Sequence, residues 1–186
     1  MQTPNLYFFA AIAIFFSVLI VIAGYYYWRN RRSSPAQFED LFAQLKSIDR
    51  NHIAQVALDL VDPSGRPKVD EEAATLEPSQ LWNLIGGLDG LEIMERNSEV
   101  LIALAFYVQQ WYPEAVPVAE RLRLDARELK FHVGRLRGAA QQGNLQISFP
   151  FYAQRAVTTY YRMTRRVLEL YEAANVPMVA DLQRSL

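Results

Sequence analysis

The first 28 residues constrain this chain more than any other feature, because none of them carries a charged side chain. Residues 6–28 read LYFFAAIAIFFSVLIVIAGYYYW. As a helix rising about 1.5 Å per residue, this run would be about 34 Å long, which is enough to cross the hydrocarbon core of a bilayer. It therefore predicts a single transmembrane helix.

The residues at the end of this run predict its direction. We expect a membrane interface made of an aromatic belt and three arginines: Tyr25, Tyr26, Tyr27, Trp28, Arg29, Arg31 and Arg32. By the positive-inside rule the arginines stay in the cytoplasm. The expected arrangement is that of a single-pass protein of the inner (plasma) membrane of bacterial type. Residues 1–5 would lie outside, residues 29–37 would form a basic juxtamembrane tether, and residues 38–186 would form a cytoplasmic domain.

Two other interpretations fit the run less well. A cleaved signal peptide carries its positive charge before a shorter apolar run and has small residues at the cleavage position. Here the charge follows the run, and bulky aromatic residues occupy that position. A buried helix of a soluble core is the other alternative, but an uncharged run of this length with such flanks is typical of a membrane span.

Residues 38–186 show the period of an amphipathic helix in almost every segment. Apolar residues recur at spacings of three and four in residues 38–48, 53–60, 90–112, 118–141 and 150–174. No segment alternates apolar and polar residues as a strand does, although residues 145–149 could be extended. The expected fold class is therefore all-α, a helical bundle of roughly 150 residues that can bury its own core.

Single residues predict where some of these helices begin and end. We expect Asp49 to cap the N-terminus of the helix over residues 53–60. Pro78 suits the first turn of a short helix, which Gly86 and Gly87 would stop.

Few residues suit catalysis or metal binding. The chain has no cysteine and two histidines, and it carries none of the glycine-rich phosphate loops or hydrolase motifs that we sought. Glu92, Glu95 and Glu99 share one helix face, but a carboxylate-bridged metal site would also need histidines at matching positions. The sequence therefore predicts no metal and no cofactor.

One group of residues keeps an enzymatic interpretation open. Asp125, Glu128 and His132 lie on one flank of the helix over residues 118–141, where an acid could orient the histidine as a general base. No serine or threonine lies near them in sequence to act as a nucleophile. Arg121 and Arg135 flank the group, which favours a solvated salt-bridge face over a catalytic site.

Charge is distributed unevenly along residues 36–186. Residues 36–115 hold fourteen acidic and five basic side chains, whereas residues 116–186 hold six acidic and eleven basic ones. Seven of the basic residues form stripes on the last two long helices: Arg123, Arg127, Lys130, Arg137, Arg155, Arg162 and Arg166. Leu124 and Phe131 would place apolar side chains beside the first stripe.

Three interpretations of the basic stripes compete. They could pair with the acidic first half, dock an acidic partner protein, or meet anionic lipid headgroups. A net charge of −1 argues against nucleic acid as a partner, and self-association is left open. We predict a membrane-anchored, non-enzymatic scaffold that recruits a protein partner, or anionic lipid, through this basic and partly apolar face. The alternative is an enzyme or small-ligand-binding bundle with its site near Asp125, Glu128 and His132.

Overall fold

The computed structural model describes residues 12–24, 38–62, 66, 68, 75–175, 180 and 182–183. The chain divides into two compact units, Met1–Ala36 and Gln37–Leu186. In the first unit, residues 12–24 are helical and their side chains are exposed. The remainder of the expected span over residues 6–28, together with the interface residues Tyr25 to Arg32, lies outside the described residues. Among the described residues, no helix is both long enough and apolar enough to cross a membrane.

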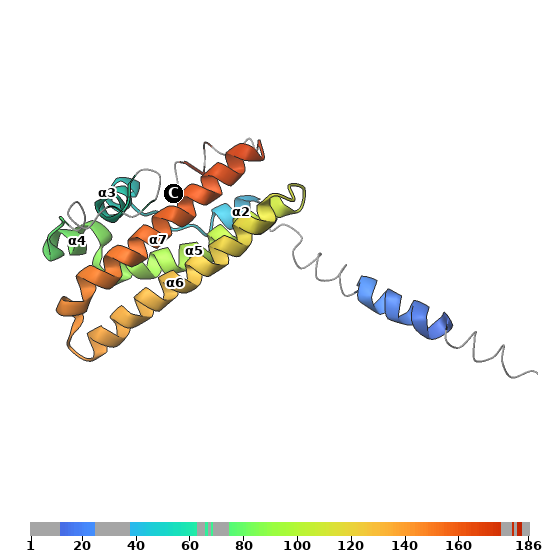
Figure 1. Ribbon diagram of the computed structural model, residues 1–186, viewed down its shortest axis with the longest axis horizontal. Coiled ribbons are helices and arrows are strands. Elements are labelled where there is room, and N and C mark those ends of the chain that lie inside the picture. The colour runs from blue at the N-terminus through green and yellow to red at the C-terminus, as the bar shows by residue number, and fades with distance from the viewer. Residues whose placement is uncertain are drawn as a thin grey trace, which may run out of the picture. The chain divides into compact units, whose positions relative to one another are not determined.

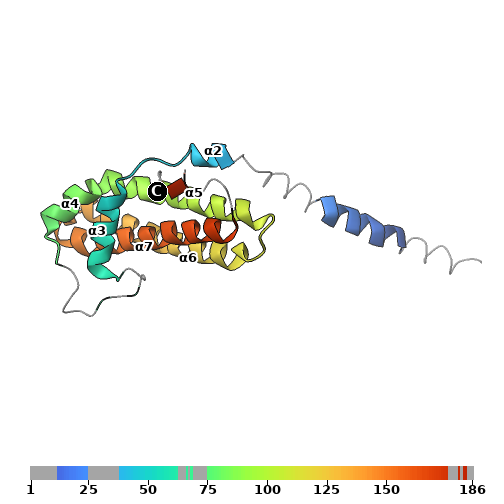
Figure 2. The same cartoon turned by 90° about the horizontal axis from the view of Figure 1, so that it is seen from above.

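The second unit is an all-helical bundle, as the sequence predicts. Its helices are α2 (Phe38–Phe42), α3 (Arg50–Leu60), α4 (Pro78–Ile85), α5 (Gly87–Gln109), α6 (Ala115–Gln141) and α7 (Leu145–Ala173). The long helices α5, α6 and α7 pack on one another, and α3 crosses α7 beside α4 (Figures 1 and 2). The core lies between these helices and is lined by Leu101, Leu129 and Met163, among others.

The local signals at the helix ends are confirmed. The Asp49 carboxylate accepts hydrogen bonds from the backbone N–H groups of Asn51 and His52, which caps α3. Pro78 opens α4, and Gly86 ends it with a φ of 77°, in the left-handed region that favours glycine.

Two expectations about helix limits are wrong. Residues 145–149 are helical rather than extended, so Pro150 lies inside α7. Proline has no N–H to donate, so Pro150 leaves the carbonyl of Gln146 without its helical hydrogen bond. Gln146 is exposed and lies near the start of the helix, where this carbonyl is accessible to solvent. Helix α2 ends at Phe42 and does not continue to residue 48. The side-chain amide of the buried Asn97 accepts from the backbone N–H of Lys46 at 3.0 Å and donates to its carbonyl at 2.8 Å, so these two groups are not available for helical hydrogen bonds.

Buried polar groups tie the helices together. Asn97 on α5 also donates to the hydroxyl of Tyr160 on α7 at 3.2 Å, and the hydroxyl of Tyr171 donates to the carbonyl of Leu104 at 3.1 Å. Burial raises the pKa of Tyr160 to about 12 and also raises the pKa of Tyr171. Both phenols are therefore neutral hydrogen-bonding groups of the core.

Candidate functional site

The sequence predicts a solvated position for Asp125, and this prediction is wrong, because the residue lies inside the bundle. Its side chain is 2% exposed and is turned from α6 towards α7, where it pairs with Arg166. Arg121, one turn earlier on α6, lies 3.5 Å from the same carboxylate. The buried face of α6 includes Asp125, so the carboxylate forms a buried link between α6 and α7.

His132 is also buried, with 6% of its surface exposed, which again corrects the expected solvated face. Its Nε2 atom lies 3.7 Å from Glu128, and Glu128 lies 3.6 Å from Arg162 on α7. Burial lowers the pKa of His132 and the charge of Arg155 lowers it further, whereas Glu128 raises it; burial dominates, so the pKa lies below its usual value. The structure thus brings the three candidate catalytic residues to the contact between α6 and α7, among arginines.

The basic residues singled out in the sequence fall into two groups. Four of them have acidic partners: Arg123 pairs with Glu120, Arg137 with Glu92 and Glu95, Arg162 with Glu128, and Arg166 with Asp125. Arg137 therefore joins the basic second half to the acidic helix α5. Within the described residues, the other three, Arg127, Lys130 and Arg155, form no ion pair. Internal pairing accounts for part of the basic stripes but leaves these three cations unneutralised.

Large apolar side chains are exposed beside these cations. Leu124 and Phe131, both expected to lie beside the basic stripe, are 52% and 59% exposed. Phe151 on α7 is 54% exposed, and Arg155 stacks over its ring at 4.4 Å. Ring contacts from Phe131 to His132, from His132 to Tyr152 and from Tyr152 to Phe151 connect the two helices. We call the combined surface the basic–apolar face: Leu124, Arg127, Lys130, Phe131, Arg135, Phe151 and Arg155.

Sequence reasoning missed two members of this face. Arg135 stacks over the ring of Tyr152 at 5.7 Å, although it had been interpreted only as a flank of the histidine group. Phe151 and Arg155 both lie inside the helix expected over residues 150–174. Their four-residue spacing places them on one side of that helix and is the signal that could have identified the pair.

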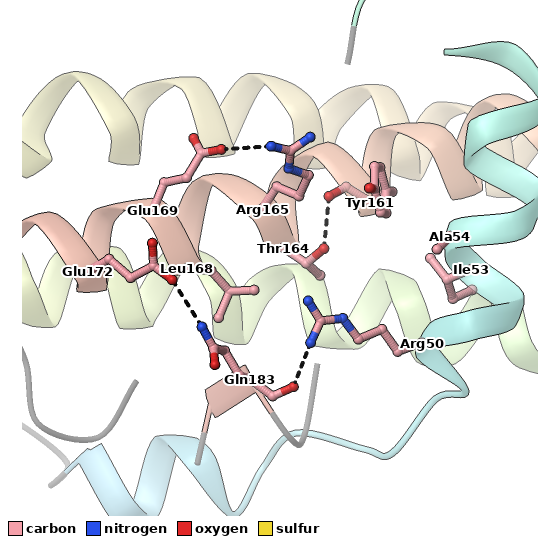
Figure 3. Close-up of a pocket in the computed structure, with 10 residues that line it drawn as sticks. All are labelled: Arg50, Ile53, Ala54, Tyr161, Thr164, Arg165, Leu168, Glu169, Glu172 and Gln183. Atoms are coloured by element: carbon pink, nitrogen blue, oxygen red, sulfur yellow. Dashed lines mark hydrogen bonds and ion pairs between the residues drawn. The ribbon is translucent and has the colours of Figure 1, made fainter. Parts of the chain in front are cut away.

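A polar cavity of about 410 Å³ lies between α3, α7 and the C-terminal segment (Figure 3). Arg50 donates to the carbonyl of Gln183 at 2.9 Å, and the Gln183 amide donates to Glu172 at 3.0 Å. Arg165 and Glu169 pair with each other at 3.3 Å. Since the charged groups of this cavity already have partners within the domain, it is a weaker candidate than the basic–apolar face.

The described residues contain no group of three or more His, Asp or Glu side chains placed to hold a metal ion. Comparison with protein-family models, with curated proteins and with solved structures found no match to this chain. The functional argument therefore depends on the chemistry of its own surfaces.

Proposed function

We propose that this chain is a membrane-anchored, non-enzymatic interaction domain that recruits an acidic partner protein through the basic–apolar face. One observation carries the proposal: the exposed rings of Phe131 and Phe151 are connected by ring contacts through His132 and Tyr152, and Arg155, which stacks over Phe151, has no acidic partner among the described residues. Clustered apolar side chains beside cations are typical of docking surfaces. An acidic, partly apolar segment would neutralise the cations and cover the rings.

A protein fits this face better than a lipid surface does. Three of its four cations are arginines, and arginine with aromatic residues is enriched in protein interfaces, where lysine is depleted. The enzymatic alternative is less well supported, because Asp125 and His132 are buried and Asp125 is held in ion pairs. A general base must be able to reach the proton that it abstracts.

The anchoring part of the proposal rests on the uncharged run of residues 6–28 and the arginines that follow it. We expect the full chain to stay in the membrane fraction after alkaline carbonate washing, because a helix buried in lipid is not held by surface charge. A chain beginning at Ser33 should be released. Release of the full chain by carbonate would contradict the anchor, and retention of the shortened chain would show that residues 6–28 are not needed for membrane attachment.

The docking part is tested by removing the unpaired cations. The variant Arg127→Gln, Lys130→Gln and Arg155→Gln should lose an in-cell crosslinked partner that purifies with the wild-type chain in detergent. Each lost charge in such a contact costs binding and slows association. The helix content should stay unchanged and the unfolding midpoint should change little, since none of the three side chains has an ion pair to lose and the variant removes only the exposed contact of Arg155 with Phe151.

A matched control removes three exposed cations from the acidic half, Lys46→Gln, Arg66→Gln and Arg96→Gln, with the same change in net charge. This control should keep the partner. Equal loss in both variants would indicate a general charge effect, and equal retention would reject the basic–apolar face as the docking surface. Binding to vesicles containing anionic lipid, without a protein partner, would favour the lipid interpretation instead.

A further inference from the structure

Helix α4 packs against α7 (Figure 2). A second cavity lies between α4 and the start of α7. Its volume is about 610 Å³, within the range of ligand sites in proteins. Eight residues line it, four from each helix: Pro78, Ser79, Trp82, Asn83, Leu145, Gln146, Phe149 and Pro150. We call it the α4–α7 groove. It shares no residue with the basic–apolar face.

Aromatic rings and prolines form the apolar part of the groove. The ring of Trp82 stays 42% exposed and lies 4.7 Å from the ring of Phe149, which is 3% exposed. The indole is therefore held against a buried ring while part of it still faces solvent. A ring fixed in this way loses little conformational freedom when a ligand packs on it.

The polar part of the groove is uncharged. Ser79, Asn83 and Gln146 form no side-chain hydrogen bond within the part of the chain that the structure describes. Each of them can donate to a carbonyl oxygen. The groove therefore offers aromatic surface and hydrogen-bond donors, and it offers no cation or anion to a charged ligand.

We propose that the α4–α7 groove binds a proline-rich peptide segment in the polyproline II conformation. Proline residues carry no charge and lack an N–H, and a segment in this conformation exposes backbone carbonyls that have no hydrogen-bond partner within it. Its rings pack on aromatic side chains such as Trp82, and its carbonyls accept from Asn83 and Gln146. The acidic segments that suit the basic–apolar face have no cation to meet here.

Titration calorimetry tests the groove with the full chain in a neutral detergent. The probe is decaproline with an acetylated and an amidated end, and the control peptide is an equally capped Gly-Ser decamer. We expect saturable heat with decaproline and none with the control. No binding of decaproline, or equal binding of both peptides, would overturn the proposal. Binding of neutral indole without binding of decaproline would make the groove a small-molecule site, which also rejects it.

Two variants locate the binding. Trp82→Ala should weaken decaproline binding by about tenfold or more, as expected for a tryptophan at the centre of a contact. Trp111→Ala, the matched control at another exposed tryptophan, should leave it unchanged. Since Trp82 supports Phe149, the exposed Gln146→Ala variant provides a second test that leaves the core intact; it should weaken binding severalfold. Wild-type affinity in both groove variants, with unchanged helix content, would exclude this site.

Discussion

Replacement of Asp125 by asparagine is expected to lower the free energy of unfolding by about 3 kcal/mol, because it breaks a buried ion pair by removing one partner. The side chain is 2% exposed, and its carboxylate faces Arg166 on α7 and Arg121 on its own helix. Removal of its charge leaves two guanidinium groups close together with no acid between them. Because the side chain of Arg166 is 29% exposed, water relieves part of the cost.

Urea unfolding of the full chain in detergent, followed by circular dichroism, measures this effect. The matched control is Glu120→Gln, which removes an acid from an exposed pair with Arg123 on the same helix. Its cost should be within about 1 kcal/mol. The double variant Asp125→Leu with Arg166→Met should recover most of the loss, because apolar groups of similar size can replace a buried ion pair. Equal costs for the two single variants would contradict the buried role of Asp125.

Replacement of Asp59 by alanine is expected to cost about 3 kcal/mol at neutral pH, because it leaves the buried Gln154 amide and the partly buried donors of Thr75 and Leu76 without an acceptor. The carboxylate accepts from the backbone N–H groups of Thr75 and Leu76, at 2.9 and 3.3 Å, and from the side chain of Gln154 on α7. It therefore joins α3 to the segment before α4 and to α7. The exposed acid Glu99, changed to glutamine, is the control, and its change should have little effect.

The contribution of Asp59 should depend on pH in a defined direction. Burial raises the pKa of its carboxyl group, but the hydrogen bonds from Thr75, Leu76 and Gln154 together outweigh burial and hold the pKa below the ordinary value of 3.8. The unfolded chain then binds a proton more readily than the folded chain, so stability falls as the pH drops below about 3.8. The difference between wild type and Asp59→Ala should shrink over that range. A difference that is constant with pH would show that the carboxylate charge is not what stabilises the contact.

The helices themselves could be predicted from the sequence, because their signals are local. Spacings of three and four between apolar residues identified α5, α6 and α7, and the cap at Asp49 and the stop at Gly86 depend on residues within one turn. The errors at Phe42 and at residues 145–149 came from contacts outside the local window. Asn97 replaces helical bonds at Lys46, and Phe149 packs on Trp82.

The candidate site was predicted only in part. The sequence showed that basic residues and exposed apolar residues gather on α6 and α7, but it did not show which cations stay unpaired. Arg137 meets Glu92 and Glu95, which precede it by more than 40 residues, and Arg166 meets Asp125 across two helices. Such partners depend on how each helix is rotated and shifted against its neighbour.

What the sequence alone determined is therefore the all-helical class and the apolar seams, since helical periodicity depends on neighbours along the chain. The tertiary structure alone decided that Asp125 and His132 are buried, that Arg127, Lys130 and Arg155 have no ion pair among the described residues, and that α4 and α7 form a groove. These properties arise where separate helices meet. The packing of the helices fixes which charges are close enough to neutralise one another and which side chains remain accessible to a partner.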